Sequence, residues 1–306
     1  MNRENDFTKK IGQFSANFPN EFKKRWDQLE SEKPQPTRLR KVQEMDFEEF
    51  TQKAIEQDPK FVQLIVDSLY AGDAYILRNA FSKVFMADLK RNTHELWSKV
   101  SQSYHKILEG CPDFHRIIDK TISANYTFKA IKHSYYFFPW NDDPLNIYEE
   151  IWRRWRIAKL VGGLHPNSYE KNTPKDGVID RIQVVRYPPS EGFLETHVDP
   201  FQNQRLIFSA YMSRRGVDFD EGGFYVVDEN DYRVDFEDKV EIGDMVYLYA
   251  TVLHGVSHVD TQKPLDWNSD DGRWFLGLYS NSSNEVPNRF EGKSVSIQEK
   301  GTLFVK

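Results

Sequence analysis

The sequence predicts an α+β protein in which a mainly helical N-terminal half packs on a C-terminal β-barrel or sandwich. Up to about residue 175, apolar residues recur at the spacing of one helix face, whereas from Asp180 onward short β-type runs alternate with turn residues. No flexible linker or low-complexity tract separates the two parts. We therefore expect residues 1–177 to form a mainly helical region and residues 178–306 to form the β core on which it packs.

The clearest helical pattern of the first half spans residues 81–108, where Phe85 and Leu89 begin a series of apolar residues at steps of three, four or seven. Ser82 is expected to cap the start of this helix, and Gly110 to end it. A short strand is expected at residues 72–77, and further helices at 46–57, 60–69 and 145–160.

The second half shows the alternation typical of short strands, with Gly, Asp, Asn and Pro in nearly every gap. So many short strands after a helical block favour a closed or two-layered β architecture, because a single open sheet would leave an apolar face uncovered. The expected strands cover residues 182–187, 193–198, 205–212, 223–227, 232–236, 245–250, 252–259 and 274–279.

The amino-acid composition limits which binding partners and which cellular compartment are expected. The formal net charge is −6, without the clustered Lys and Arg that nucleic acid or an anionic membrane surface requires, so neither is expected as a partner. With Cys111 as its one cysteine, the chain forms no intramolecular disulfide and no thiolate zinc site, which fits a reducing compartment. Residues 1–6 lack the apolar run of a signal peptide, and no stretch reaches the roughly 20 apolar residues that cross a bilayer. We expect a cytoplasmic protein; its oligomeric state is not indicated.

A candidate metal site begins with His197 and Asp199, which stand two apart in a β-type run that Pro200 ends. Residues two apart on a strand share a face, so both side chains could reach one ion. His254, in a second β-type run, could supply a third ligand. Two imidazoles and one carboxylate form the facial triad suited to non-haem iron(II), which leaves coordination positions open for other ligands.

Other interpretations of these histidines stay open. His197 and Asp199 could form an ordinary ion pair at a strand end, and His258 could replace His254 because residues four apart on a strand also share a face. A helical zinc motif is disfavoured at this point by Gly255. His133, beside the aromatic run 135–140, is a weaker candidate for a pocket residue.

An ordered set of motifs between residues 181 and 280 resembles the double-stranded β-helix, or jelly-roll, core of the iron(II)/2-oxoglutarate-dependent dioxygenase superfamily. The similarity is greatest to its prolyl-hydroxylase-like and phytanoyl-CoA-hydroxylase-like branches and covers about a third of the chain. Each motif alone is unspecific, whereas their order is specific. The motifs are Val184-Val185-Arg186-Tyr187, His197-Val198-Asp199, Glu221-Gly222-Gly223-Phe224-Tyr225-Val226, Gly243-Asp244-Met245-Val246-Tyr247-Leu248, His254-Gly255-Val256-Ser257-His258-Val259 and Arg273-Trp274-Phe275-Leu276.

The resemblance implies cofactors and residue roles. His197, Asp199 and His254 would be the catalytic residues and the ligands of Fe²⁺, with 2-oxoglutarate as co-substrate and O₂ as oxidant. Arg273 would bind the distal carboxylate of 2-oxoglutarate, since a guanidinium can donate two parallel hydrogen bonds to it. Tyr187 could donate a further hydrogen bond to the same carboxylate.

The position of Arg273 departs from the family pattern, because it follows His254 by 19 residues, a wider gap than usual. Residues 261–272 would then form an inserted loop. Lys263 lies nearer the usual spacing and is the alternative, although Pro264 follows it and no strand begins there.

The implied reaction is hydroxylation of a C–H bond of a small-molecule substrate, with release of succinate and carbon dioxide. Asp199 favours hydroxylation over halogenation, whereas desaturation, cyclisation and epimerisation use the same triad. The helical half, with Trp152, Trp155 and His165, would wall the pocket. A protein or peptide hydroxylase of prolyl type is the first alternative, and a non-enzymatic β-barrel binding module is the second.

Overall fold

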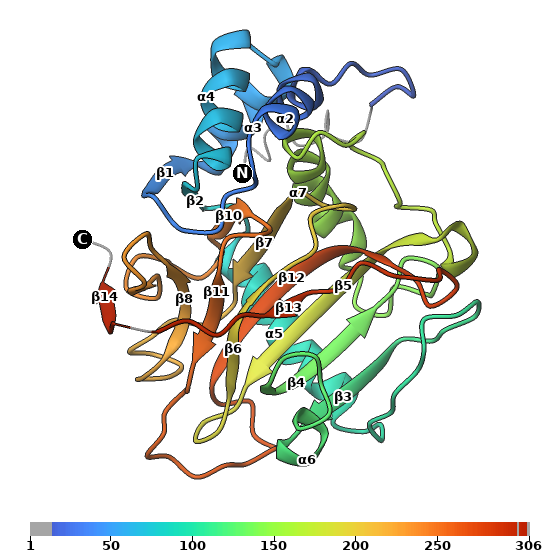
Figure 1. Ribbon diagram of the computed structural model, residues 1–306. Helices are drawn as coiled ribbons and strands as arrows, with labels where there is room; N and C mark the ends of the chain where they lie inside the picture. The colour runs from blue at the N-terminus through green and yellow to red at the C-terminus, as the bar shows by residue number, and fades with distance from the viewer. Residues whose placement is uncertain (1–13, 299, 305–306) are drawn as a thin grey trace, which may run out of the picture.

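The computed structural model describes residues 14–298 and 300–304 and shows a mixed α+β fold around one large, strongly curved sheet (Figure 1). The N-terminal residues 1–6 lie outside the described part. In space the strands follow the order β1-β2-β10-β7-β12-β5-β4-β6-β11-β8-β9-β14, while β3 pairs with β4 and β13 with β6. The strands are β1 (Val42–Asp46), β2 (Ala74–Arg78), β3 (Phe114–Ile118), β4 (Ala130–Phe137), β5 (Val178–Tyr187), β6 (Phe193–Val198), β7 (Leu206–Tyr211), β8 (Gly223–Val227), β9 (Arg233–Asp235), β10 (Met245–Tyr249), β11 (His254–Ser257), β12 (Arg273–Ser282), β13 (Lys293–Ser294) and β14 (Thr302–Phe304).

Strand β4 turns the sheet back on itself. Its residues His133 to Phe137 pair with β5, whereas Ala130 and Ile131 pair with β6. The layer containing β7, β12 and β5 therefore lies opposite the layer containing β6, β11 and β8, and side chains of both layers line one cavity. This arrangement of two facing antiparallel layers is the one expected of the β core. Each of the eight strands expected from the sequence is present.

The helices gather largely at one end and on one side of the sheet (Figure 1). Among the described residues, no helix combines the length and the apolar character that a membrane span requires. Asp46, Asp58 and Ser82 cap the helices that follow them, and the Ser82 hydroxyl accepts a hydrogen bond from the Phe85 amide as expected. The helices are α2 (Glu21–Glu32), α3 (Phe47–Glu56), α4 (Pro59–Tyr70), α5 (Lys83–Trp97), α6 (Lys120–Ser123), α7 (Tyr148–Val161) and the 3₁₀ turn η1 (Pro174–Asp176).

Helix α5 is shorter than the predicted helix 81–108, because it ends at Trp97. Beyond that point the apolar pattern does not face the core: Val100 and Tyr104 are 47% and 60% exposed. The Val100 carbonyl also accepts a hydrogen bond from His115 Nε2 at 2.8 Å, which draws this segment toward β3. Periodicity alone therefore overestimated the helix.

The expectation of a mainly helical N-terminal half is not confirmed. Four strands of the first 177 residues, β1 to β4, belong to the same sheet as the later strands. Strand β2 pairs with β10, and one hydrophobic core extends through both parts, as in the contact of Trp26 with Tyr249 at 5.5 Å between ring centroids. The proposed boundary between residues 177 and 178 falls between η1 and β5, and the division into two domains stays a prediction.

Candidate active site

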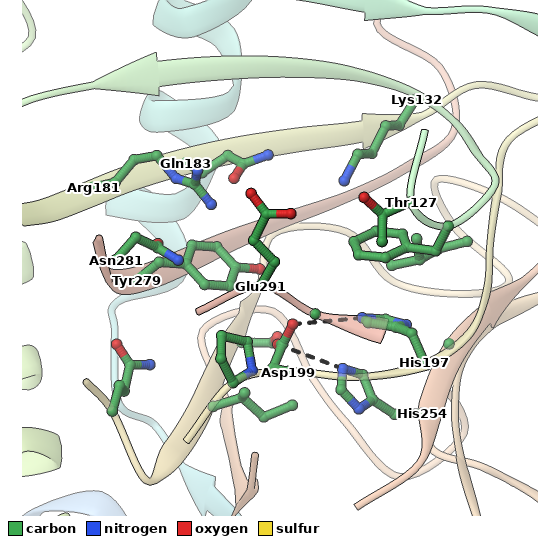
Figure 2. A pocket seen from close by; sticks show the side chains of 18 of the residues that line it. Thr127, Lys132, Arg181, Gln183, His197, Asp199, His254, Tyr279, Asn281 and Glu291 are labelled. Carbon is green, nitrogen blue, oxygen red and sulfur yellow. Dashed lines mark ion pairs between the residues drawn. The ribbon is translucent and has the colours of Figure 1, made fainter. Parts of the chain in front are cut away.

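His197, Asp199 and His254 come together beside the paired strands β6 and β11 (Figure 2). The two strands pair antiparallel with His254 opposite His197, so the imidazoles lie side by side with 4.2 Å between ring centroids. Asp199 follows the end of β6 at Val198. One potential ligand atom from each of the three residues lies within 4.8 Å of the other two, which is the spacing of a shared ion.

Backbone carbonyls orient both imidazoles toward Asp199. Nδ1 of His197 lies 2.9 Å from the Glu195 carbonyl, and Nδ1 of His254 lies 2.8 Å from the Val252 carbonyl. A carbonyl only accepts, so each Nδ1 carries the proton and each Nε2 presents a lone pair. The two Nε2 atoms lie 3.8 Å from the two carboxylate oxygens of Asp199 (Figure 2). Two neutral nitrogen donors and a carboxylate are a fitting donor set for iron(II).

Burial sets the electrostatics of the triad. It lowers the pKa of His197 well below its usual value, with the neighbouring His254 as the next cause, so His197 stays neutral at physiological pH. Burial also raises the pKa of Asp199. The ring of Phe128 stacks on His197 at 4.7 Å and covers one face of the imidazole. A divalent cation would offset the cost of burying the Asp199 carboxylate, because an opposite charge favours the ionised form.

The triad opens into a cavity of about 320 Å³ that extends along β5 and β12. Apolar side chains such as Ile207, Phe224 and Phe275 alternate in its wall with polar ones. This volume and this mixed lining are typical of sites for small ligands.

Arg273 lies buried in the wall of this cavity, opposite Tyr187 on β5. Its Nε donates a hydrogen bond of 2.5 Å to Oε1 of Glu237, which also accepts the Phe224 amide at 2.7 Å. The hydroxyls of Tyr187 and Tyr211 and the second oxygen of Glu237 are buried without a hydrogen-bond partner among the described residues. Buried hydroxyls normally have a partner. Tyr187 lines the cavity, so a ligand carboxylate at the guanidinium could accept a hydrogen bond from its hydroxyl, and the residues present fit 2-oxoglutarate.

Lys263, the alternative to Arg273, does not line the cavity. Its ammonium group is half-exposed and pairs with Asp220 and Asp260, each at 2.8 Å. His258, the alternative to His254, stacks on Phe193 at 4.4 Å and borders a second, separate cavity. The structure thus brings the first-choice residues together and leaves both alternatives outside.

The expected pocket wall from the helical half differs from the observed one. Trp152, Trp155 and His165 do not line the cavity, and His133 is hydrogen-bonded to His115 at 2.8 Å and to the Tyr135 hydroxyl at 2.9 Å. The first half instead contributes one residue before β3 and the segment leading into β4. Its lining residues are Ile107, Tyr126, Thr127, Phe128 and Lys132.

Arg186 is a residue whose role the sequence did not reveal. Its buried guanidinium donates to the carbonyls of Asp266, Trp267 and Asp271 at 2.7, 3.1 and 2.7 Å. It therefore anchors the stretch 261–272, the expected inserted loop, directly before Arg273. The available signal was an arginine directly after the apolar pair Val184 and Val185 in a predicted strand, since a buried guanidinium needs several acceptors.

Comparison with known proteins yields structures but no sequence family. No family model matches the chain, and no curated protein matches it. Among solved structures, a Pseudomonas putida prolyl-4-hydroxylase is 12% identical with a TM-score of 0.45, covering 71% of this chain and 96% of its own. A full-length Neurospora crassa protein in complex with alpha-KG and thymine is 14% identical with a TM-score of 0.47, covering 79% and 86%. JOX2 in complex with 2OG, Fe and JA is 12% identical with a TM-score of 0.44, covering 93% and 85%.

Two further similar structures, from Caulobacter crescentus and Burkholderia pseudomallei, are described as members of the 2OG-Fe(II) oxygenase family, the group that the sequence motifs resemble. With TM-scores below 0.5 they do not bear on the assignment, which depends on the side chains of the site itself.

Proposed function

We propose that the protein is an iron(II)- and 2-oxoglutarate-dependent oxygenase that hydroxylates a C–H bond of a small molecule. The observation that carries the proposal is the convergence of His197, Asp199 and His254 within 4.8 Å, with both Nε2 atoms turned toward the carboxylate. When bound, iron(II) and 2-oxoglutarate supply the oxidative decarboxylation, to succinate and carbon dioxide, that activates oxygen.

The chain's own residues would bind and orient the reactants. His197, Asp199 and His254 would hold the metal on one face and leave its other face open to the cavity. Arg273 would bind the distal carboxylate of 2-oxoglutarate, with Tyr187 donating its hydroxyl hydrogen to the same group. Apolar side chains of the facing layers, such as Ile207, Phe224 and Phe275, would line the space between these groups.

The shape of the site favours a small molecule over a protein substrate. The cavity is lined from both β layers and from the β4 segment, and its volume of about 320 Å³ suits a ligand that enters it. A peptide hydroxylase would instead need a groove that admits an extended chain beside the metal.

An anaerobic titration tests this proposal without knowledge of the substrate. Iron(II) and then 2-oxoglutarate are added to the purified protein, and the visible metal-to-ligand charge-transfer band is recorded. We expect a band in the wild type and in the control variant His258→Ala, because His258 lies outside the triad. The band should vanish in His197→Ala and His254→Ala and weaken in Arg273→Ala. A folded, iron-loaded wild-type protein without the band would refute 2-oxoglutarate as co-substrate and leave a binding barrel as the better interpretation.

A further inference from the structure

The outer part of the cavity contains two cationic side chains whose charge is not balanced within the fold. Lys132 reaches in from β4 and Arg181 from β5, and Figure 2 shows both head groups directed toward the space beside the triad. Within residues 14–298 and 300–304, neither side chain forms an ion pair or a hydrogen bond. Nε of Arg181 is a buried donor without an acceptor. A buried N–H donor normally has an acceptor, so this one indicates a missing ligand.

The Arg181 guanidinium is held in place by two aromatic rings. Its Cζ lies 5.0 Å from the ring centre of Tyr279, the residue opposite it on β12, and 5.5 Å from that of Tyr136. Tyr279 in turn lies over Gly277, where a Cβ would come within 2.5 Å of the ring. These contacts fix the guanidinium before any ligand arrives, which lowers the entropy cost of binding one.

Lys132 shares this space at an electrostatic cost. Burial, and next the positive charge of Arg181, lower the pKa of Lys132 to about 8. Each of the two side chains is partly desolvated and repels the charge of the other, so the charged form of Lys132 is disfavoured. An anion placed between them would reverse this cost.

The acidic side chains of the cavity do not balance the charge. Of the four cationic side chains that line the cavity, Arg273 and Arg289 pair with Glu237 and Glu291, which leaves Lys132 and Arg181 with Asp199 and an excess of one positive charge. Asp199 belongs to the triad, and Glu291 is half-exposed and pairs with Arg289 at 2.6 Å. Iron(II) and the 2-oxoglutarate dianion carry equal and opposite charges, so their binding leaves the excess of positive charge unchanged. The excess remains available to the substrate.

We propose that the substrate is a carboxylate, and that Lys132 and Arg181 bind its anionic group and thereby fix which C–H bond faces the metal. This rests on the oxygenase function proposed above. A carboxylate is favoured because it is planar and can accept two hydrogen bonds from a guanidinium that contacts two tyrosine rings. The side chains of Gln183 and Asn281 line the same part of the cavity and can add amide hydrogen bonds.

The test compares matched neutral and anionic probes. A panel of aliphatic and aryl monocarboxylates, each paired with the primary amide of the same skeleton, is titrated into the wild-type protein by calorimetry. The titration is made both without metal and anaerobically with iron(II) and 2-oxoglutarate. We expect carboxylates to bind more tightly than their amides, and Arg181→Gln and Lys132→Met each to weaken carboxylate binding by about tenfold or more, with amide binding little changed.

Two controls keep the result interpretable. Lys129→Met removes the same kind of side chain three residues away, at the border of the second cavity, and should bind carboxylates like the wild type. Glu291→Gln tests whether Glu291 is a counter-ion of the two cations: unchanged carboxylate binding supports the proposal, whereas a large gain in affinity would show that Glu291 already balances their charge. Circular dichroism establishes that each variant is folded, and Arg181→Lys provides a conservative replacement that should retain part of the preference.

The outcomes separate this inference from the proposed function. If the charge-transfer band forms but no carboxylate binds better than its amide, the substrate inference is wrong and the oxygenase stands. If carboxylates are preferred through Lys132 and Arg181 but no band forms, the anion site exists in a protein of another activity. Equal carboxylate affinity of Arg181→Gln, Lys132→Met and wild type would also overturn the inference.

Discussion

Two arginine–tyrosine pairs lie on the β5–β12 ladder, one at its end and the other toward the opposite end, and they differ in one respect. Arg273 on β12 stands opposite Tyr187 on β5, and Arg181 on β5 stands opposite Tyr279 on β12. The pairs are six residues apart, roughly 20 Å along an extended strand. Arg273 has a carboxylate partner within the fold, Glu237, whereas Arg181 has none among the described residues.

Arg273 is therefore held by the fold itself, whereas Arg181 remains available to bind an anionic ligand. The bond from Glu237 fixes the Nε edge of Arg273, and Gly223 leaves room for the Glu237 side chain, which a Cβ there would meet at 2.3 Å. The remaining N–H donors of Arg273 are therefore held in a fixed orientation. Such a fixed site is suitable for 2-oxoglutarate, because the same co-substrate binds in every turnover. Arg181 and Lys132 remain uncompensated until an anion binds.

The largest effect should follow Glu237→Ala, which leaves the Arg273 guanidinium buried without its partner. Removing one member of a buried ion pair costs about 3–5 kcal/mol, so the free energy of unfolding should fall by that order and 2-oxoglutarate binding should weaken. Urea denaturation measures the first effect and the charge-transfer titration the second. Glu237→Gln, which keeps the shape and one acceptor, should lose less. A stability equal to that of the wild type in Glu237→Ala would show that this pair does not anchor the site.

The next largest effect should follow Arg273→Lys, which keeps the positive charge but removes the planar guanidinium group. We expect 2-oxoglutarate to bind roughly tenfold more weakly, because a lysine cannot donate two parallel hydrogen bonds to a carboxylate. Calorimetry with 2-oxoglutarate on the iron-loaded protein measures the change. Lys263→Met serves as the matched control, since Lys263 lies outside the cavity, and a loss of affinity there instead would reverse the assignment of the two residues.

Carboxylate binding at Lys132 and Arg181 is expected to depend on pH. The charged groups that influence Lys132 are Arg181 on β5 and Asp199 after β6, and the unliganded pKa of Lys132 is about 8. A bound carboxylate raises that pKa, so the charged ammonium binds it more tightly than the neutral amine does. Carboxylate affinity should be constant between about pH 6 and pH 7, where the ligand is ionised and Lys132 is charged, and fall by about tenfold or more in total as the pH rises through 8 and above. In Lys132→Met this fall should be absent; its persistence there would assign the titration to another group.

The smallest effect should be the change in stability caused by replacing Arg181 or Lys132. Arg181→Met and Lys132→Met each remove a charge that has no partner among the described residues, so the free energy of unfolding should stay within about 1 kcal/mol of the wild-type value or rise. Urea denaturation in parallel with Glu237→Ala gives the direct contrast. Should Arg181→Met destabilise the protein as much as Glu237→Ala, the two pairs would be equivalent structural elements and the comparison would fail.

The sequence by itself determined the strands and the choice of candidate ligands. Alternation of side chains and turn residues are local features, so the eight strands of the second half could be located without knowledge of their partners. The spacing of His197 and Asp199 is equally local, because both lie at the end of one strand. The Ser82 cap was predictable for the same reason.

Tertiary structure decided which distant residues meet. The register that sets His254 opposite His197, the pairing of Glu237 with Arg273, and the recruitment of β2 and β4 into the sheet all depend on contacts between segments far apart in the chain. No local pattern encodes such pairings. The same reason explains why Lys132, expected in a helical region, lies on β4 beside Arg181, and why the cationic end of the cavity was visible only in the folded chain.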